Sequence, residues 1–470
     1  MSDHAPLLER AFAIDPTEES YDVAVEGELP PFVRGTYYLN GPARFARGGL
    51  RYRHWLDGDG MVCALHFGAG GIRFTNRFVR TQKLVTEESA GRPLFRTFGT
   101  AFPGDRLRRG VATESPVNVS VYPYRGTLLA LGEQSLPVEL DPDTLATRGP
   151  YDFGGQINDL SPFAAHPKFD PEIGGLVNFG VWFDPARPVL VLYQFAADGR
   201  LADRTRVPLP YPCSVHDFAL TPRHAVFFLS PHLLDAAALR AGQTTLEALS
   251  WQPDRGSRLL LVDRTAGAAT EVSVGRGYCL HLVNAFEAAG RLTADVIEFD
   301  RPVYGEYLVP DLFAGVSPGR PVRYVVDAAN GALLERRELD YAHAPDFPAV
   351  DPRDAGRPYR DFWMLGIAAA GRPGRKFFDE LARADWDVAA ARDVYRPPPR
   401  HYFGGEPAFV PDPRRSRAGA VICPVFDAGT AATTFAMFDA YALARGPVAR
   451  LRLRSPIHLG FHATFHEHDA

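Results

Sequence analysis

The feature that most constrains the fold of this chain is a pair of short apolar runs joined by a turn, repeated from one end of the sequence to the other. In each pair, apolar or alternating residues flank a turn that contains Gly, Asp or Pro. This pattern is typical of antiparallel β-hairpins. Because no polar linker separates the pairs, the sequence predicts an all-β fold and favours a β-propeller over a series of separate sandwiches. The pairs lie at residues 126–144, 186–210, 257–275, 322–339 and 433–453.

Two segments depart from the hairpin pattern. Residues 230–251 place apolar side chains at helical spacing, and residues 374–395 mix helix-forming residues with charges. We expect both to be helical insertions outside the β core. For the first segment, capping of a sheet and a role at a membrane surface or tunnel entrance are both open.

The composition fits a turn-rich soluble protein. Gly and Pro make up 84 of 470 residues, and 46% of the residues are hydrophobic, whereas average usage of Gly and Pro is about 12%. The length alone would allow roughly three domains or one long all-β unit. Since the net charge is −5, there is no basic surplus that would indicate a nucleic-acid partner.

The cysteines and the N-terminus indicate a reducing compartment. Cys63, Cys213, Cys279 and Cys423 are far apart and form no CxxC pair, so we expect buried free thiols. The first residues lack a signal peptide, and no apolar stretch approaches the 18 residues of a membrane span. We therefore expect a cytoplasmic protein, with peripheral membrane contact through an amphipathic patch still open.

Histidines are the main chemical resource, because the signatures of nucleotide-binding loops, α/β-hydrolases and zincins are absent. His166, His216, His281 and His462 lie beside apolar residues at or near predicted strand ends. Their intervals of 50, 65 and 181 residues place them in different hairpin units, which could meet only at a common axis. Four neutral imidazoles would leave open positions on an octahedral iron. From spacing alone, packed or surface histidines remain the competing interpretation.

The surroundings of these histidines resemble a known family. The segments AHPKFDPEIGGLVNFG, VHDFALTPRHAVFF, HLVNAFE and GFHATF are similar to the four iron-ligand blocks of the carotenoid cleavage oxygenases. That family includes bacterial apocarotenoid oxygenases, stilbene-cleaving dioxygenases and the retinoid isomerase of the eye. Further similar segments, in family order, include GTYYLNGPARF, HWLDGDGMV, ELDPDTLATRG, DPRDAGRPYR and EPAFVPDP. The resemblance runs from residue 35 to residue 465.

The resemblance implies a fold and a reaction. It implies a single-domain seven-bladed β-propeller over residues 1–470, with residues 1–20 as an N-terminal extension and a dome of loops and helices over a central iron. It implies that His166, His216, His281 and His462 bind non-haem Fe(II). The implied reaction is oxidative cleavage of a conjugated C=C bond with O2 to aldehyde or ketone products. No catalytic side chain is expected beyond these ligands and their supporting carboxylates.

Three carboxylates bond the outer nitrogens of the imidazoles in the family. Glu133 and Glu406 match two of them, and Asp346 stands where the family usually has Glu. An Asp is one methylene shorter, so we expect it to reach its imidazole only through a water molecule or with a shifted backbone. For Asp346, a surface-paired acid is the alternative.

The substrate class depends on three further positions. Stilbene-cleaving relatives carry a Lys before the first Glu and a Tyr in the preceding loop, where this chain has Gly132 and Phe98. A buried phenol would therefore lose about 1–3 kcal/mol per missing hydrogen bond. Val119 falls where some relatives have a Thr beside the iron, and its alternative role is plain packing. We therefore expect a hydrophobic polyene, a carotenoid or apocarotenoid, as the substrate beside O2.

Two other functions remain open at this point. One is a dioxygenase of stilbenes or phenylpropene-type aromatic alkenes, and the other is a non-catalytic propeller that binds a lipid or a protein. For a membrane-dissolved substrate, an apolar entrance is required. The candidates are Leu233, Leu234, Ala238, Leu239, Leu312 and Phe313, with ordinary dome packing as the alternative.

Overall fold

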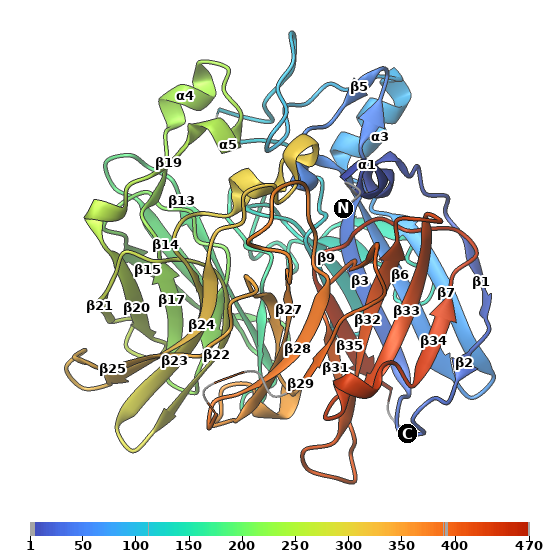
Figure 1. The fold of residues 1–470 in the computed structure, drawn as a ribbon. Coiled ribbons are helices and arrows are strands. Elements are labelled where there is room, and N and C mark those ends of the chain that lie inside the picture. The colour runs from blue at the N-terminus through green and yellow to red at the C-terminus, as the bar shows by residue number, and fades with distance from the viewer. Residues whose placement is uncertain (1–4, 111, 389, 391–392, 469–470) are drawn as a thin grey trace.

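Seven antiparallel sheets surround a central axis in this computed structural model, which describes residues 5–110, 112–388, 390 and 393–468. Each sheet has four to six strands and forms one blade, so the described residues make a seven-bladed β-propeller (Figure 1). This confirms the predicted fold class. Loops and short helices lie above one end of the blades and form the dome.

Each blade runs from an inner strand at the axis to an outer strand at the rim. Blade 1 is β35 (Ala463–Glu467), β3 (Gly35–Arg44), β6 (Asp59–Gly68), β7 (Gly71–Phe78) and β1 (Ser20–Val23). Blade 2 is β8 (Ser120–Tyr124), β9 (Thr127–Leu131), β10 (Val138–Leu140) and β11 (Thr147–Pro150). Blade 3 is β12 (Lys168–Asp170), β13 (Gly175–Trp182), β14 (Val189–Phe195) and β15 (Leu201–Pro208).

The remaining blades follow the same order. Blade 4 is β16 (Phe218–Leu220), β17 (His224–Leu229), β20 (Ser257–Asp263) and β21 (Ala269–Gly275). Blade 5 is β22 (Tyr278–Ala288), β23 (Arg291–Phe299), β24 (Gly319–Asp327) and β25 (Leu333–Glu338). Blade 6 is β26 (Asp346–Ala349), β27 (Asp361–Gly366), β28 (Glu380–Asp385) and β29 (Asp393–Tyr395). Blade 7 is β30 (His401–Phe403) and β31 (Ala408–Pro411), both beside β32 (Gly419–Asp427), then β33 (Ala432–Asp439), β34 (Ala449–Arg452) and β2 (Glu26–Gly27).

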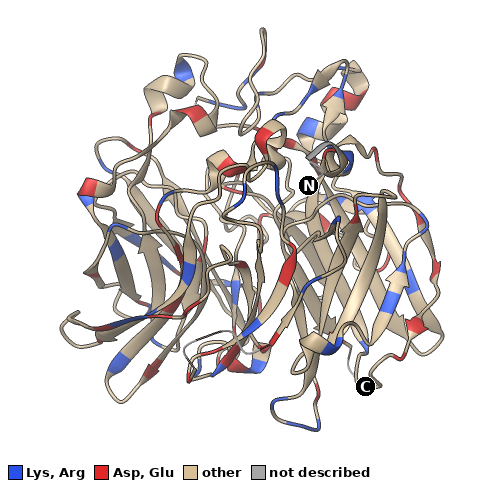
Figure 2. Cartoon of the chain, in the orientation of Figure 1, with Lys and Arg blue, Asp and Glu red and all other residues tan. Residues whose placement is uncertain are grey.

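The polarity of a strand follows its distance from the axis. Middle strands such as β9 and β17 are buried along their whole length, because neighbouring blades cover both of their faces. Outer strands such as β15 and β25 are largely exposed and carry Arg, Asp and Glu (Figure 2), and charges protect such an edge from pairing with other chains. The five predicted hairpins are confirmed, since each spans two adjacent strands of one blade.

The ring is closed by strands from the two ends of the chain. The C-terminal strand β35 pairs with β3 in the first blade, from Leu39 opposite Ala463 to Gly35 opposite Glu467. The N-terminal strand β2 pairs with β34 in the last blade. Neighbouring inner strands also contact one another, as β12 does with β16 and β16 with β22. Closure therefore fixes the starts of all the inner strands around one axis.

The dome and the rim contain the short helices of the described residues. Those elements are α1 (Ala5–Leu8), α2 (Arg10–Ala13), α3 (Gln82–Ala90), α4 (Ala236–Arg240) and α5 (Thr245–Ala248), with 3-10 turns at Trp55–Asp57, Pro253–Arg255, Tyr304–Tyr307, Val309–Asp311, Pro352–Asp354 and Leu443–Arg445. Two small hairpins accompany them, β4 (Ala46–Arg47) with β5 (Leu50–Arg51) and β18 (His232–Leu234) with β19 (Leu249–Trp251). None of the described helices is long and apolar enough to cross a membrane.

The two predicted helical insertions have different outcomes. Residues 230–251 form α4 and α5 between β18 and β19, so the prediction of a helical insertion is partly confirmed. For residues 374–395 the prediction is wrong, because the described residues there form β28 and β29 of blade 6. Pairing of β28 between β27 and β29 outweighs the local preference of its Ala, Leu, Glu and Arg residues for helix.

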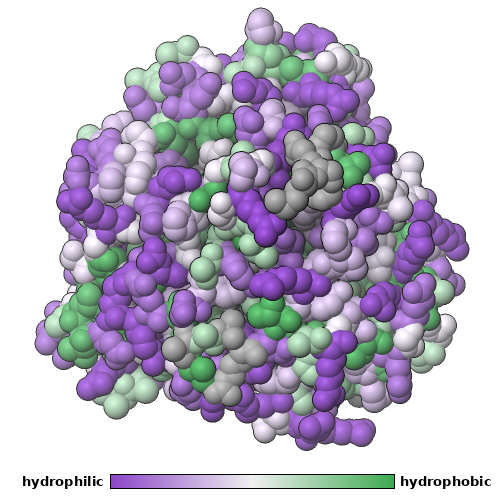
Figure 3. All heavy atoms as spheres, viewed as in Figure 1, coloured by the Kyte–Doolittle hydropathy of each residue, from purple (hydrophilic) through white to green (hydrophobic). Residues whose placement is uncertain are grey.

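The candidate entrance residues are mostly buried. Leu233, Leu239, Leu312 and Phe313 are between 1% and 7% exposed, which favours dome packing for these four. On the face shown in Figure 3, hydrophobic residues are scattered among hydrophilic ones. All four cysteines are free and buried, as predicted.

A buried group of charges joins the dome to the first blade. Lys83 of α3 is fully buried, and its Nζ lies 2.6 Å from Oδ1 of Asp59 and 3.0 Å from Oε2 of Glu87. Arg47 also reaches Asp59, with Nη2 2.6 Å from Oδ2. Burial lowers the pKa of Lys83, but the charges of Asp59 and Glu87 outweigh it and raise the pKa overall. These residues thus form a compensated ion cluster at the start of β6.

Replacing Lys83 with Met should destabilise the protein strongly. The substitution leaves the two buried carboxylates of Asp59 and Glu87 beside Arg47 without the cation of Lys83, and removing one partner from a buried ion pair typically costs about 3–5 kcal/mol. We expect the free energy of unfolding in urea to fall by that amount, whereas Gln82→Met on the exposed side of α3 should change it by less than about 0.5 kcal/mol. Equal stabilities of the two variants would show that the cluster does not hold the dome.

Candidate metal centre

Four imidazoles meet at the axis, each at the start of an inner strand from a different blade. His166 and His216 lie two residues before β12 and β16, His462 lies directly before β35, and His281 is the fourth residue of β22. The hairpins of four blades thus deliver one histidine each. Histidines separated by 50, 65 and 181 residues can meet in this way because the blades form a ring.

The imidazoles form a compact, buried cluster. One nitrogen from each of the four rings can be chosen so that all lie within 4.8 Å of one another. The Nε2 atoms of His166 and His216 are 2.9 Å apart. The side chain of His216 is 8% exposed, and those of the other three are still less exposed. Such a set of converging donors is the arrangement by which proteins hold a transition-metal ion.

Carboxylates lie against the outer nitrogens of three of the rings. Nδ1 of His216 is 2.6 Å from Oε1 of Glu133, and Nδ1 of His462 is 3.3 Å from Oε2 of Glu406. A carboxylate at Nδ1 holds the proton on that nitrogen and leaves the lone pair of Nε2 directed inward. Burial raises the pKa of Glu406 to about 8.

Asp346 reaches its imidazole directly. Its Oδ1 lies 2.6 Å from Nδ1 of His281, so no bridging water is needed. The backbone beside it is irregular: Phe347 has a φ of 53°, and the pairing of β26 with β27 shifts register between Asp346 and Ala349. A bulge of this kind re-aims a side chain. Asp346 is 3% exposed, which excludes the surface-paired alternative.

The charge state of two of the rings suits a metal. Burial and the neighbouring imidazoles lower the pKa of His166 and of His462 well below 6.5, so both rings are neutral near pH 7. The Nε2 atom of His281 is buried and has no hydrogen-bond partner among the described residues. A metal ion would satisfy this nitrogen and accept the lone pairs of the other rings. The residues present therefore fit a four-histidine metal site.

A fourth carboxylate beside the cluster was not anticipated. Asp217 follows His216 and is 4% exposed, and its Oδ1 lies 3.9 Å from Nδ1 of His166 and 2.8 Å from Nζ of Lys168. Burial would raise the pKa of Asp217, but Lys168 outweighs this effect and lowers it. The acid directly after a ligand in VHDFALT was the available signal.

The three predicted substrate positions lie in different surroundings. Phe98 is in the dome, with its ring centroid 4.9 Å from that of His54 and 5.2 Å from that of Tyr304. Val119 is buried, and its carbonyl accepts the N–H of His462. At Gly132 a Cβ atom would lie 2.2 Å from Oγ of Ser115. The space that a side chain at position 132 would need is therefore filled.

Aromatic side chains line the dome side of the histidine cluster. Phe347 lies 5.3 Å from the rings of both His281 and His462, measured between centroids. Trp55 contacts Phe461 at 4.2 Å and Tyr307 at 5.3 Å. Sequence reasoning did not assign these residues, although Trp55 and Phe347 stand within or beside the quoted motifs. They give the site an apolar wall.

A propeller whose inner strands carry four converging histidines, three of them backed by carboxylates, defines the class of protein. Residues 13–467 match the family model described as retinal pigment epithelial membrane protein. The chain is 30% identical to the apocarotenoid-15,15'-oxygenase of Synechocystis, over 97% of this chain and 95% of that one. It is 29% identical to the isoeugenol monooxygenase of Pseudomonas putida, over 93% and 94%. The cobalt-substituted structure of the Synechocystis apocarotenoid oxygenase superposes with a TM-score of 0.91 at 28% identity, covering 99% of each chain.

The protein belongs to the carotenoid cleavage oxygenase family. Membership follows from the match over nearly the whole chain, and it makes the protein an oxygenase of this family. The predicted family is therefore confirmed.

One buried acid behind the site should make the stability depend on pH. Glu306 accepts the N–H of Ser317 at 2.6 Å, and burial raises its pKa to about 7. Between its ordinary pKa of about 4.5 and pH 7, the unfolded chain loses this proton while the folded protein keeps it. The folded state is therefore penalised progressively as the pH rises through this range.

Replacing Glu306 with Gln should remove this penalty. At pH 5 we expect Glu306→Gln and the unmodified protein to have similar free energies of unfolding, and at pH 8 the variant should be more stable by roughly 2–3 kcal/mol. Denaturant titrations at several pH values measure this difference, with the exposed Glu335→Gln as the control. A difference that does not vary with pH would contradict the assignment.

Proposed function

We propose that the protein is a non-haem Fe(II) dioxygenase that cleaves a conjugated C=C bond of a carotenoid or apocarotenoid. The observation that supports this most directly is the cluster of His166, His216, His281 and His462 at the axis of a propeller of this family. The family relative at 30% identity is named for an apocarotenoid substrate. The carboxylates beside three of the rings, of which Asp346 is buried, support a metal rather than a purely structural cluster.

The proposed reaction converts one C=C bond and one O2 into two C=O groups. Both oxygen atoms of O2 enter the products, so no further reductant is needed. His166, His216, His281 and His462 would hold Fe(II), which would supply the redox chemistry with O2. Asp346 bonds Nδ1 of His281, and Glu133 and Glu406 lie beside the outer nitrogens of His216 and His462, so that the three acids orient these rings.

The dome residues bind and orient the substrate in this proposal. Phe347 lies against the rings of His281 and His462, and Trp55, Tyr307 and Phe461 pack beside it to form the apolar wall. An extended polyene would lose its hydration against such a wall, which favours its binding. The same wall excludes water from the reacting bond.

The surroundings of the site offer a phenol few anchors at the two positions used by stilbene-cleaving relatives. Phe98 has no hydroxyl group, and a side chain at position 132 would collide with Ser115 and with the backbone of Val117. These two observations favour a polyene over a phenolic stilbene.

Cleavage of an aromatic alkene is the second candidate. The isoeugenol monooxygenase relative is nearly as similar as the apocarotenoid enzyme. The hydroxyl groups of Tyr304 and Tyr278 are buried near Ser214, two residues before His216. This cluster could bind a substrate oxygen in place of the absent Lys and Tyr.

Incubation of the iron-loaded protein with substrates under O2 tests the proposed reaction. We expect shortened aldehydes from an apocarotenal panel or a C40 carotenoid, identified by mass spectrometry, with both new oxygens labelled when 18O2 is used and exchange with water is limited. Turnover of 4-hydroxystilbene, lost on methylation of its hydroxyl, would favour the aromatic candidate instead. If every polyene is recovered unchanged, the carotenoid proposal is wrong.

Removal of one imidazole tests the metal. His281→Ala should reduce bound iron and activity by more than about 100-fold, because even outer partners of a ligand are worth 10–100-fold. His401→Ala provides the control, since His401 lies at the start of β30 away from the cluster and is partly exposed. Metal analysis that finds no iron in the unmodified protein after reconstitution would support a non-catalytic propeller.

A further inference from the structure

Asp217 contacts segments from three of the four blades that supply histidines. It follows His216 in the chain, and its Oδ2 accepts the N–H of Leu282, the residue after His281, at 2.9 Å. Its Oδ1 lies 2.8 Å from Nζ of Lys168, which stands two residues after His166. One buried carboxylate therefore links the starts of β12, β16 and β22.

These links matter because the three strands share no sheet. β12, β16 and β22 belong to blades 3, 4 and 5, and strand pairing operates only within each blade. The relative positions of His166, His216 and His281 therefore depend on contacts between blades. A charge-assisted hydrogen bond and an ion pair that converge on Asp217 are the strongest type of such contact.

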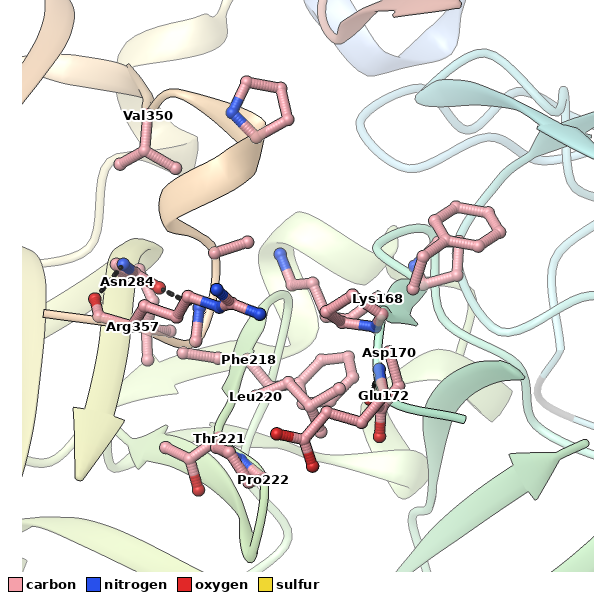
Figure 4. Close-up of a pocket in the computed structure, with 18 of the residues that line it drawn as sticks. Lys168, Asp170, Glu172, Phe218, Leu220, Thr221, Pro222, Asn284, Val350 and Arg357 are labelled. Atoms are coloured by element: carbon pink, nitrogen blue, oxygen red, sulfur yellow. Dashed lines mark hydrogen bonds between the residues drawn. The ribbon is translucent and has the colours of Figure 1, made fainter. Parts of the chain in front are cut away.

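Lys168 reaches Asp217 from a cavity on the axis. The cavity has a volume of about 340 Å³ and is lined by residues that follow the histidines, including Lys168, Phe218 and Asn284. Figure 4 shows Lys168 and Arg357 extending toward the middle of this pocket. The ammonium group also lies 5.7 Å from the ring centroid of Phe218. Lys168 is 30% exposed there, whereas Asp217 is 4% exposed.

His166 differs from the other three imidazoles in its support. Among the residues that the structure describes, no carboxylate lies within hydrogen-bond distance of its Nδ1 atom, and the acid beside it is Asp217, whose Oδ1 is 3.9 Å away. We infer that Asp217 and Lys168 are a positioning pair for the metal centre, which sets the place of His166 and holds the ligand segments of three blades in register. This inference rests on the proposed metal site. Lys168 supplies the charge that a buried carboxylate requires.

Cobalt binding to the full-length protein tests the pair without relying on activity. Co²⁺ affinity and the half-life of the complex against a chelator report binding, and the visible absorption bands of Co²⁺ report ligand geometry. We expect Asp217→Asn and Lys168→Gln each to weaken Co²⁺ binding by about 10–100-fold and to shift the bands. The double variant should bind Co²⁺ about as weakly as the more impaired of the two single variants. The effects should not add, because both substitutions remove the same interaction.

Two further variants separate positioning from general damage. Lys168→Arg restores a cation and should return the affinity and the spectrum close to those of the unmodified protein. Glu172→Gln changes an exposed acid that lines the same cavity and should change neither. If Asp217→Asn does not fold, the comparison of Lys168→Gln with Lys168→Arg still tests the pair, because Lys168 is partly exposed.

The outcomes distinguish this inference from the proposed function. Unmodified affinity and spectrum in both Asp217→Asn and Lys168→Gln would overturn the positioning pair while the metal site stands. An equal loss in Glu172→Gln, or no recovery in Lys168→Arg, would also overturn it. Failure of the unmodified protein to bind either Co²⁺ or Fe²⁺ would instead remove the metal site, and the inference with it.

Discussion

The four-histidine cluster depends on closure of the ring by pairing of β35 with β3. Each candidate ligand comes from a different blade, and no sheet hydrogen bond joins the strands of His166, His216 and His281 to one another. Their mutual distances are set by the circle of inner strands, and that circle is complete only when the last strand occupies the inner edge of the first blade. His462 lies directly before this strand, so the same pairing that closes the fold brings in the fourth imidazole.

The chemistry of the cluster follows from burial around that circle. Burial alone does not make an imidazole a metal ligand, but in this cluster the neighbouring imidazoles also lower the pKa of His166 and of His462. Burial and mutual proximity keep His166 and His462 neutral, and Asp346 bonds the outer nitrogen of His281. The dome adds aromatic residues on one side, and the axial cavity with Lys168 lies below. Aromatic packing and this cavity thus lie on different sides of the histidine segments.

The sequence specified the repeating parts of this fold better than its irregular parts. All five hairpins could be predicted, because middle strands buried on both faces read as unbroken apolar runs between clear turn residues. Residues 374–395 could not, since the partners that make Glu380–Asp385 a strand lie on neighbouring strands of blade 6 and leave no mark in the local sequence. The four histidines were marked by their motifs. The direct contact of Asp346 depends on a bulge, and the role of Asp217 depends on partners in other blades, so neither could be seen from spacing.

The position of His462 has a consequence for how the protein matures. During synthesis, three of the four imidazoles leave the ribosome more than 170 residues before the fourth. A growing chain can therefore offer an ion only His166, His216 and His281. At that stage β35 has not yet paired with β3 at the inner edge of the first blade. Metal uptake before release would act on an open, adjustable ring, whereas uptake afterwards would require an ion to enter a closed one through the dome or the axial cavity. The connectivity of the blades therefore makes the order of metal binding and ring closure a kinetic property of the protein.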